Sequence, residues 1–210
     1  MRAHIKTALT TLSATIALAI ALTATASAGR LSVSEKESEV NFRPLTLSIS
    51  GQLIRCPITL LGHFNERTIA KRAATIGTIR HVEPTTAGEP PCTGGTITIL
   101  NETLPWRVNY VNFRGTLPNI ASIRLALIGV AFKVRTSLWT CLDGTTATAP
   151  AFGEVLVGAG GRVEGLRADE RVGIPLGGGF ICEIAGTSTF EGTGTVTNLP
   201  GTAPITVTLI

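Results

Sequence analysis

The sequence predicts an all-β protein, an antiparallel β-sandwich or barrel of about a dozen short strands with one short helix and two disulfides. Short segments alternate apolar and polar residues with a period of two, as at 45–50 and 205–210. This alternation is typical of half-buried strands. Gly, Pro, Asn and Asp recur between these segments at intervals of about 6–12 residues, as turns do in such folds. Four cysteines in a chain that begins with an export signal indicate disulfides.

Residues 1–28 have the features of a cleaved signal peptide. A basic start is followed by the apolar run 9–22, and Ala26-Ser27-Ala28 supplies the small residues of a cleavage site. The apolar run, about 14 residues, is too short to span a bilayer comfortably as a helix. An uncleaved anchor or a buried helix is the alternative. We therefore expect residues 29–210 to form a single secreted, extracellular β domain.

The charge of the mature chain gives little reason to expect nucleic acid or anionic lipid as a partner. Removal of Arg2 and Lys6 with the signal peptide leaves 16 of the 18 basic residues against 14 acidic ones, a net charge of +2. No later segment has 18 consecutive apolar residues. We therefore expect no membrane span after signal cleavage.

The four cysteines all follow the signal peptide. Their even number predicts two disulfides in an oxidising compartment, with three possible connectivities. We favour Cys56–Cys92 with Cys141–Cys182, because each bond then closes one half of the chain. Each loop would contribute about 4 kcal/mol in the chain-entropy model. A zinc site is the alternative, but the chain has no Cys-x-x-Cys pair.

The first half begins with a charged segment, 29–41, that we expect to be a frayed lead-in. Strands are expected at 45–50 and 53–61, and Pro57 in the second indicates an edge position or a bulge because it lacks an N–H. Residues 65–74 predict the short helix, with Asn65 as its cap and basic residues near its end. Further strands are expected at 76–82, 96–99 and 106–110, followed by 122–135, 153–157, 161–166, 172–174, 187–197 and 205–210.

The longest apolar stretch of the mature chain, 122–135, changes the parity of its alternation. Ile123 and Leu125 occupy odd positions, whereas Phe132 and Val134 occupy even ones. One extra residue is needed to keep both sets on the core face. A bulge or bend is therefore expected at Ile128-Gly129. The terminal strand 205–210 is apolar, so we expect it to be paired inside a sheet.

Residues for catalysis are scarce in the mature chain, which has two histidines, His63 and His81, and two aspartates, Asp143 and Asp169. No Gly-x-Ser-x-Gly, phosphate loop or calcium loop is present. No catalytic residue, cofactor or metal is therefore assigned. A pair drawn from the 12 glutamates could serve a glycoside hydrolase, but the sequence does not select one.

Two groups of residues are candidates for ligand contact. Arg67, Lys71 and Arg72, with Arg80 nearby, are the densest basic group and form either a solvated face or a contact for an anionic polymer. Trp106, Tyr110 and Trp139 form either core anchors or a platform on which sugar rings stack. The expected partners are a cell-envelope or extracellular glycan, or a protein.

Three motifs resemble those of an uncharacterised group of small secreted β proteins from high-GC Gram-positive bacteria. They are Cys56-Pro-Ile-Thr-Leu, Cys92-x-Gly-Gly with Leu104-Pro105-Trp106, and Leu117-Pro118-x-Ile120-x-x-Ile123. The resemblance implies export and an all-β fold, and brings no activity or cofactor to this chain. The expected function is that of a secreted, disulfide-stabilised structural or binding protein without enzymatic activity. The alternative is a secreted hydrolase of cell-wall or extracellular glycans, which requires a cleft with two Glu about 5–10 Å apart.

Overall fold

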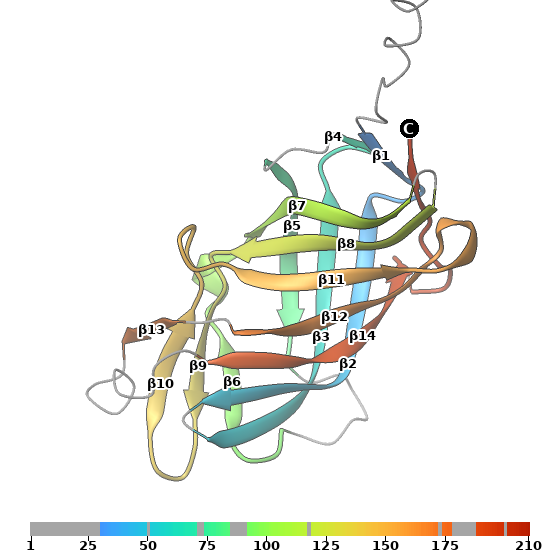
Figure 1. Ribbon diagram of the computed structural model, residues 1–210. Coiled ribbons are helices and arrows are strands. Elements are labelled where there is room, and N and C mark those ends of the chain that lie inside the picture. The colour runs from blue at the N-terminus through green and yellow to red at the C-terminus, as the bar shows by residue number, and fades with distance from the viewer. Residues whose placement is uncertain are drawn as a thin grey trace, which may run out of the picture.

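The computed structural model describes residues 30–49, 51–70, 74–84, 92–116, 119–171, 174–177, 188–199 and 201–210 (Figure 1). These residues form β-strands with two single-turn 3-10 helices, η1 (Asn101–Thr103) and η2 (Ala159–Gly161). The described ranges contain no α-helix. The all-β prediction is confirmed.

Eight strands form a closed antiparallel barrel in the order β11-β12-β14-β2-β3-β5-β7-β8 (Figure 1). Of the two architectures expected, sandwich and barrel, the barrel is the one observed. The eight strands are β2 (Glu37–Ile49), β3 (Gln52–Phe64), β5 (Thr75–Glu83), β7 (Trp106–Thr116), β8 (Asn119–Ile128), β11 (Ala151–Val157), β12 (Val163–Arg171) and β14 (Thr189–Asn198).

Two smaller sheets lie at opposite ends of the barrel (Figure 1). The terminal sheet has the order β15-β1-β4 and joins the two ends of the described chain. The second, which we call the β9 sheet, has the order β13-β10-β9-β6. Their strands are β1 (Arg30–Val33), β4 (Thr68–Ala70), β15 (Val207–Leu209), β6 (Thr96–Ile99), β9 (Ala131–Arg135), β10 (Thr140–Gly144) and β13 (Ile174–Gly177). The pairing of β15 with β1 confirms the prediction that the terminal apolar strand lies inside a sheet.

The apolar residues of the alternating pattern seen in the sequence are the ones whose side chains are buried in the barrel. Along β2, Val40, Phe42, Leu45 and Leu47 are all buried. Between Phe42 and Leu45 the register with β3 shifts, so that two β2 residues lie opposite Pro57. A bulge at this point accommodates the missing proline N–H, as expected from the sequence.

The parity change near Gly129 marks the point at which the chain leaves the barrel. β8 ends at Ile128, Gly129 has φ +86°, and β9 begins at Ala131 in the other sheet. Thr145 fixes this exit, because its N–H donates to the Val130 carbonyl (2.8 Å) and its hydroxyl accepts from the Val130 N–H (3.0 Å). The predicted bend is confirmed.

Two local predictions were wrong. The helix expected at 65–74 is replaced by β4 (Thr68–Ala70), which pairs with β1. A helix of two or three turns is marginal without packing. Ile69 instead becomes buried in the terminal sheet, where it is 5% exposed. The frayed lead-in at 29–41 is also wrong, because Leu31 and Val33 alternate inward on β1 and β2 begins at Glu37.

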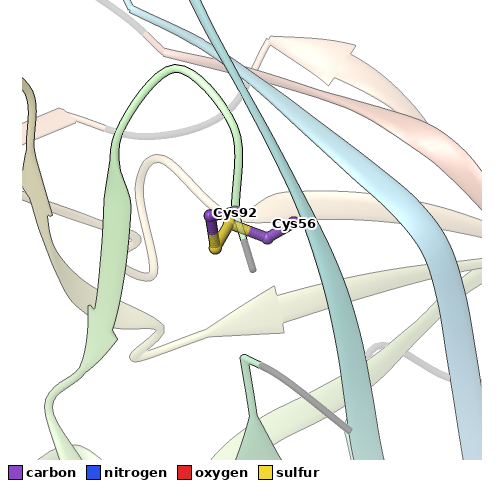
Figure 2. The surroundings of a disulfide bond; sticks show 2 residues. All are labelled: Cys56 and Cys92. Carbon is purple, nitrogen blue, oxygen red and sulfur yellow. A yellow bond between two sulfur atoms is a disulfide. The ribbon is translucent and has the colours of Figure 1, made fainter. Parts of the chain in front are cut away.

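The disulfide Cys56–Cys92 is present, as predicted (Figure 2). It joins β3 to the turn that precedes β6, and its two Cα atoms are 4.2 Å apart. Arg55 and Thr93 exchange two backbone hydrogen bonds beside it, of 3.0 and 2.9 Å. The predicted partner of Cys141, Cys182, lies outside the described residues, so the second disulfide stays a prediction.

Candidate binding site inside the barrel

The barrel interior contains a cavity of about 90 Å³ beneath the terminal sheet. Barrel strands supply its wall, while Leu31, Ile69 and Val207 of β1, β4 and β15 cover its end. The other lining residues are Val33, Ser38, Val40, Leu60, Gly62, His63, Phe64, Ile76, Gly77, Thr78, Ile79, Val108, Ile123, Leu125, Leu127, Val155, Val163, Leu166, Val196 and Ile205. We call this the first cavity.

A second cavity of about 90 Å³ lies toward the β9 sheet. Ile97 and Ile99 of β6 and Phe132 of β9 cover its end. The other lining residues are Phe42, Leu45, Ile58, Leu60, Val82, Trp106, Leu127, Val130, Ala151, Phe152, Gly153, Leu166, Ala168 and Phe190. We call this the second cavity.

Both cavities are lined almost entirely by apolar residues. Ser38, His63 and Thr78 are the polar members of the first cavity's lining, and the second cavity's lining has none. An eight-stranded barrel has an interior just wide enough to be filled by side chains or to hold one small ligand. The interior therefore suits an uncharged apolar molecule, because burial of a charge without a partner is strongly unfavourable.

The segment 92–106 builds the cover of the second cavity. The Cys56–Cys92 disulfide and the Arg55–Thr93 pairing hold the turn before β6 against β3 (Figure 2). Gly94 makes this approach possible, since a Cβ there would lie 2.1 Å from the Leu53 carbonyl oxygen, and its φ is +82°. β6 then presents Ile97 to the barrel interior, where it is 7% exposed.

Trp106 ends this segment and is 3% exposed. Its indole N–H donates to the Thr103 hydroxyl at 2.9 Å, and that hydroxyl donates to the Leu100 carbonyl at 2.7 Å. This chain of hydrogen bonds satisfies the one polar atom of the indole while its ring lines the second cavity. The short turn η1 thus sets the position of the largest side chain in the site.

The three aromatic residues considered for sugar stacking do not form one platform. Trp106 and Tyr110 are buried and face the barrel interior, where burial raises the pKa of the Tyr110 phenol. Trp139 lies outside the barrel in the turn between β9 and β10, and its backbone N–H donates to the Thr136 hydroxyl at 3.2 Å. Trp106 and Tyr110 thus have the environment of core anchors.

The basic group considered for an anionic polymer is only partly described. Arg67 is exposed and donates to the Ser34 carbonyl (2.6 Å) and to Glu35 (3.3 Å). Arg80 lies 3.7 Å from Glu37. Lys71 and Arg72 lie outside the described residues. The described members are therefore engaged with nearby carboxylates, and sequence reasoning did not anticipate these ion pairs.

A second charged group lies on the outer wall of the barrel around Glu154. Its carboxylate accepts from the Ser122 hydroxyl (2.5 Å) and from Arg167, and Arg114 lies 3.9 Å away. Hydrogen bonding by Ser122 and the Arg167 guanidinium hold the pKa of Glu154 below its usual range. Beside Glu154, the guanidinium of Arg124 lies 4.6 Å from the centre of the Phe152 ring. This network links β8, β11 and β12 across their outer face.

Asp143 is a buried carboxyl where β10 meets the barrel, and it is 3% exposed. It accepts from the Gly144 N–H at 2.7 Å and is hydrogen-bonded to the side chain of Ser188, the residue before β14. Burial raises the pKa of Asp143 to about 6, against the lowering effect of these two hydrogen bonds. Nearby, Phe132 and Phe190 pack edge to face with centroids 5.4 Å apart.

None of the three hollows in the described part of the chain is lined by a carboxylate. The third of these, with a volume of about 660 Å³, lies between η2, β15, the end of β7 and the start of β8. The two histidines pair with single glutamates, His63 with Glu37 (2.5 Å) and His81 with Glu83 (2.8 Å). Across the described ranges no three His, Cys, Asp or Glu side chains could together hold a metal ion.

Comparisons of the chain with family models, with curated proteins and with solved structures find no match. In the part of the chain that the structure describes, no helix has the length and apolar character to cross a membrane.

Proposed function

We propose that this protein is secreted and binds a small, uncharged, apolar molecule inside its barrel. The observation that carries the proposal is the pair of adjoining apolar cavities along the barrel interior. An unfilled apolar cavity forfeits dispersion contacts, and native interiors contain few voids larger than a water molecule. A ligand that fills such space restores these contacts.

The covers at both ends support a binding role. Each cavity is covered by a separate small sheet, and the strands of the terminal sheet are three or four residues long. Short strands at chain ends are regions that open locally at low free-energy cost. The terminal sheet therefore offers a route by which a ligand enters without unfolding the barrel.

Export is supported by the signal-like residues 1–28 and by the Cys56–Cys92 disulfide. Cleavage after Ala28 would leave one residue before β1 begins at Arg30. N-terminal sequencing of protein recovered from culture medium should begin at Gly29. Recovery in the cell with Met1 intact would contradict export.

Xenon is a suitable first probe of binding, because dry apolar cavities take up xenon. We expect saturable binding measured by xenon NMR, with uptake in both cavities. Ala168→Leu extends a side chain that lines the second cavity and should abolish binding there. Ala121→Leu, at an exposed position on β8, is the matched control and should retain both sites. No saturable xenon uptake by the folded wild-type protein would refute the binding proposal.

A further inference from the structure

Three leucines line both cavities, and we call this shared set the leucine waist. Leu60, Leu127 and Leu166 are shared by the two linings. They belong to β3, β8 and β12. In the barrel order, two strands separate β12 from β3, two separate β3 from β8, and one separates β8 from β12. The three strands that carry the waist are therefore spaced almost evenly around the barrel (Figure 1).

The two cavities follow one another along the barrel rather than lying side by side. On β2, Val40 lines the first cavity and Phe42 lines the second. On β14, the corresponding residues are Val196 and Phe190. Each strand thus crosses from one cavity to the other along its length, and the waist lies between them.

Rotation of the three leucine side chains is the movement that would open the waist. A leucine side chain has several staggered rotamers, and exchange between them moves its two methyl groups while the backbone stays in place. Of the three, Leu60 is 8% exposed, and the other two are partly buried. Leucine rotation would join two spaces of about 90 Å³ each into one elongated space of about twice that volume.

The dimensions distinguish a linear ligand from a compact one. A cavity of roughly 150 Å³ lined by aliphatic and aromatic side chains holds benzene. Each half of the interior is about 90 Å³, which is smaller. A six-membered ring must be accommodated in one half alone, whereas an unbranched chain that passes the waist can distribute its volume over both.

Building on the proposed function, we propose that the interior binds an unbranched, uncharged aliphatic chain that passes through the leucine waist and fills both cavities. The orientation follows from the polar residues. Ser38, His63 and Thr78 belong to the first cavity, and the second cavity's lining has no polar residue. A chain that carries a hydroxyl at one end therefore places it in the first cavity, beneath the terminal sheet.

A homologous series of primary alcohols tests this inference by calorimetric titration of the oxidised protein. Each methylene buried adds about 0.8 kcal/mol, so affinity should rise about fourfold per carbon from 1-butanol upward. The rise should stop when the chain fills both cavities. Cyclohexanol has the same number of carbons as 1-hexanol and should bind at least tenfold more weakly.

Variants of the waist provide the controls. Leu166→Ala enlarges the space between the cavities, so it should raise cyclohexanol affinity and reduce the discrimination against the ring. Leu166→Met keeps the volume and should retain the wild-type order of affinities, even if the alanine variant fails to fold. Leu53→Ala, at a side chain that is 48% exposed, should change neither.

The outcomes separate this inference from the proposed function. Equal affinities of wild-type protein for cyclohexanol and 1-hexanol would overturn the linear-chain inference and leave apolar binding intact. An affinity that does not increase with chain length would overturn the inference in the same way. No binding of any alcohol, with no uptake of xenon, would overturn both.

Discussion

The raised pKa of Asp143 predicts that the free energy of unfolding falls as the pH rises through the mildly acidic range. Its ordinary pKa of 3.8 is raised to about 6 in the folded protein, chiefly by burial. Between these values the folded state retains a proton that the unfolded state has lost. Stability from this group is therefore complete below about pH 4 and is lost as the pH rises to about 6. The difference of about two pKa units corresponds to about 3 kcal/mol.

The substitution Asp143→Asn isolates this effect because asparagine stays neutral at every pH. Its carbonyl oxygen can still accept from the Gly144 N–H, and its amide can donate to Ser188. Urea unfolding at pH 4, 5, 6 and 7, followed by tryptophan fluorescence, gives the free energy of unfolding of both proteins. The variant should be about equal to wild type at pH 4 and about 3 kcal/mol more stable at pH 7.

Glu154→Gln is the control, because the stability contributed by Glu154 should change with pH in the opposite direction to that contributed by Asp143. The pKa of Glu154 is lowered, so its stabilisation is present above the unfolded value of 4.5 and is lost as the pH falls. The deficit of Glu154→Gln relative to wild type should therefore shrink on acidification. A stability difference between Asp143→Asn and wild type that is the same at all four pH values would refute the account of Asp143.

Three further predictions concern the segment that covers the second cavity. Replacing Cys56 and Cys92 together with alanine should lower the free energy of unfolding by about 4 kcal/mol in the chain-entropy model for a 36-residue separation, measured by urea unfolding. Gly94→Ala should destabilise more than Gly129→Ala, since both have positive φ but only at Gly94 would the new Cβ strike a carbonyl, and equal losses would contradict this. Thr103→Val should cost about 1–3 kcal/mol by leaving the Trp106 N–H unpaired, and it should also shift the tryptophan emission.

Local pattern predicted much of the fold. The two-residue period identified strands such as β2, β3 and β8, and its change of parity located the exit at Gly129. Loop closure within one half of the chain selected Cys56–Cys92. These features depend on residues near one another in sequence or on a simple count, so they are readable without tertiary structure.

The errors near the amino terminus arose where tertiary pairing decides. Thr68–Ala70 forms a strand because it pairs with β1, and the residues around 68–70 carry no sequence pattern that predicts this pairing. The charged residues around Glu37 suggested a frayed segment. In the structure Glu37 and Glu39 lie on the outer face of β2, whose inner face, from Val40 onward, is buried.

The candidate site could not be predicted in the same way. Leu60, Leu127 and Leu166 are far apart in the sequence, and each looks like an ordinary inward leucine of a strand. They line the same interior only when eight strands close with a particular register. The aromatic and basic residues were chosen from the sequence for the ligands that their side chains can contact. The cavities, in contrast, are formed by the three-dimensional arrangement of ordinary apolar side chains.

The most direct measurement of the central claim is an isotope-edited NOE experiment on the oxidised protein saturated with 1-hexanol. The alcohol should show contacts to methyl groups of the leucine waist. Its two ends should contact Val196 in the first cavity and Ala168 in the second. The contacts to Val196 should come from the hydroxyl end. Contacts confined to exposed residues such as Leu53 and Leu138, with none inside the barrel, would contradict an interior binding site.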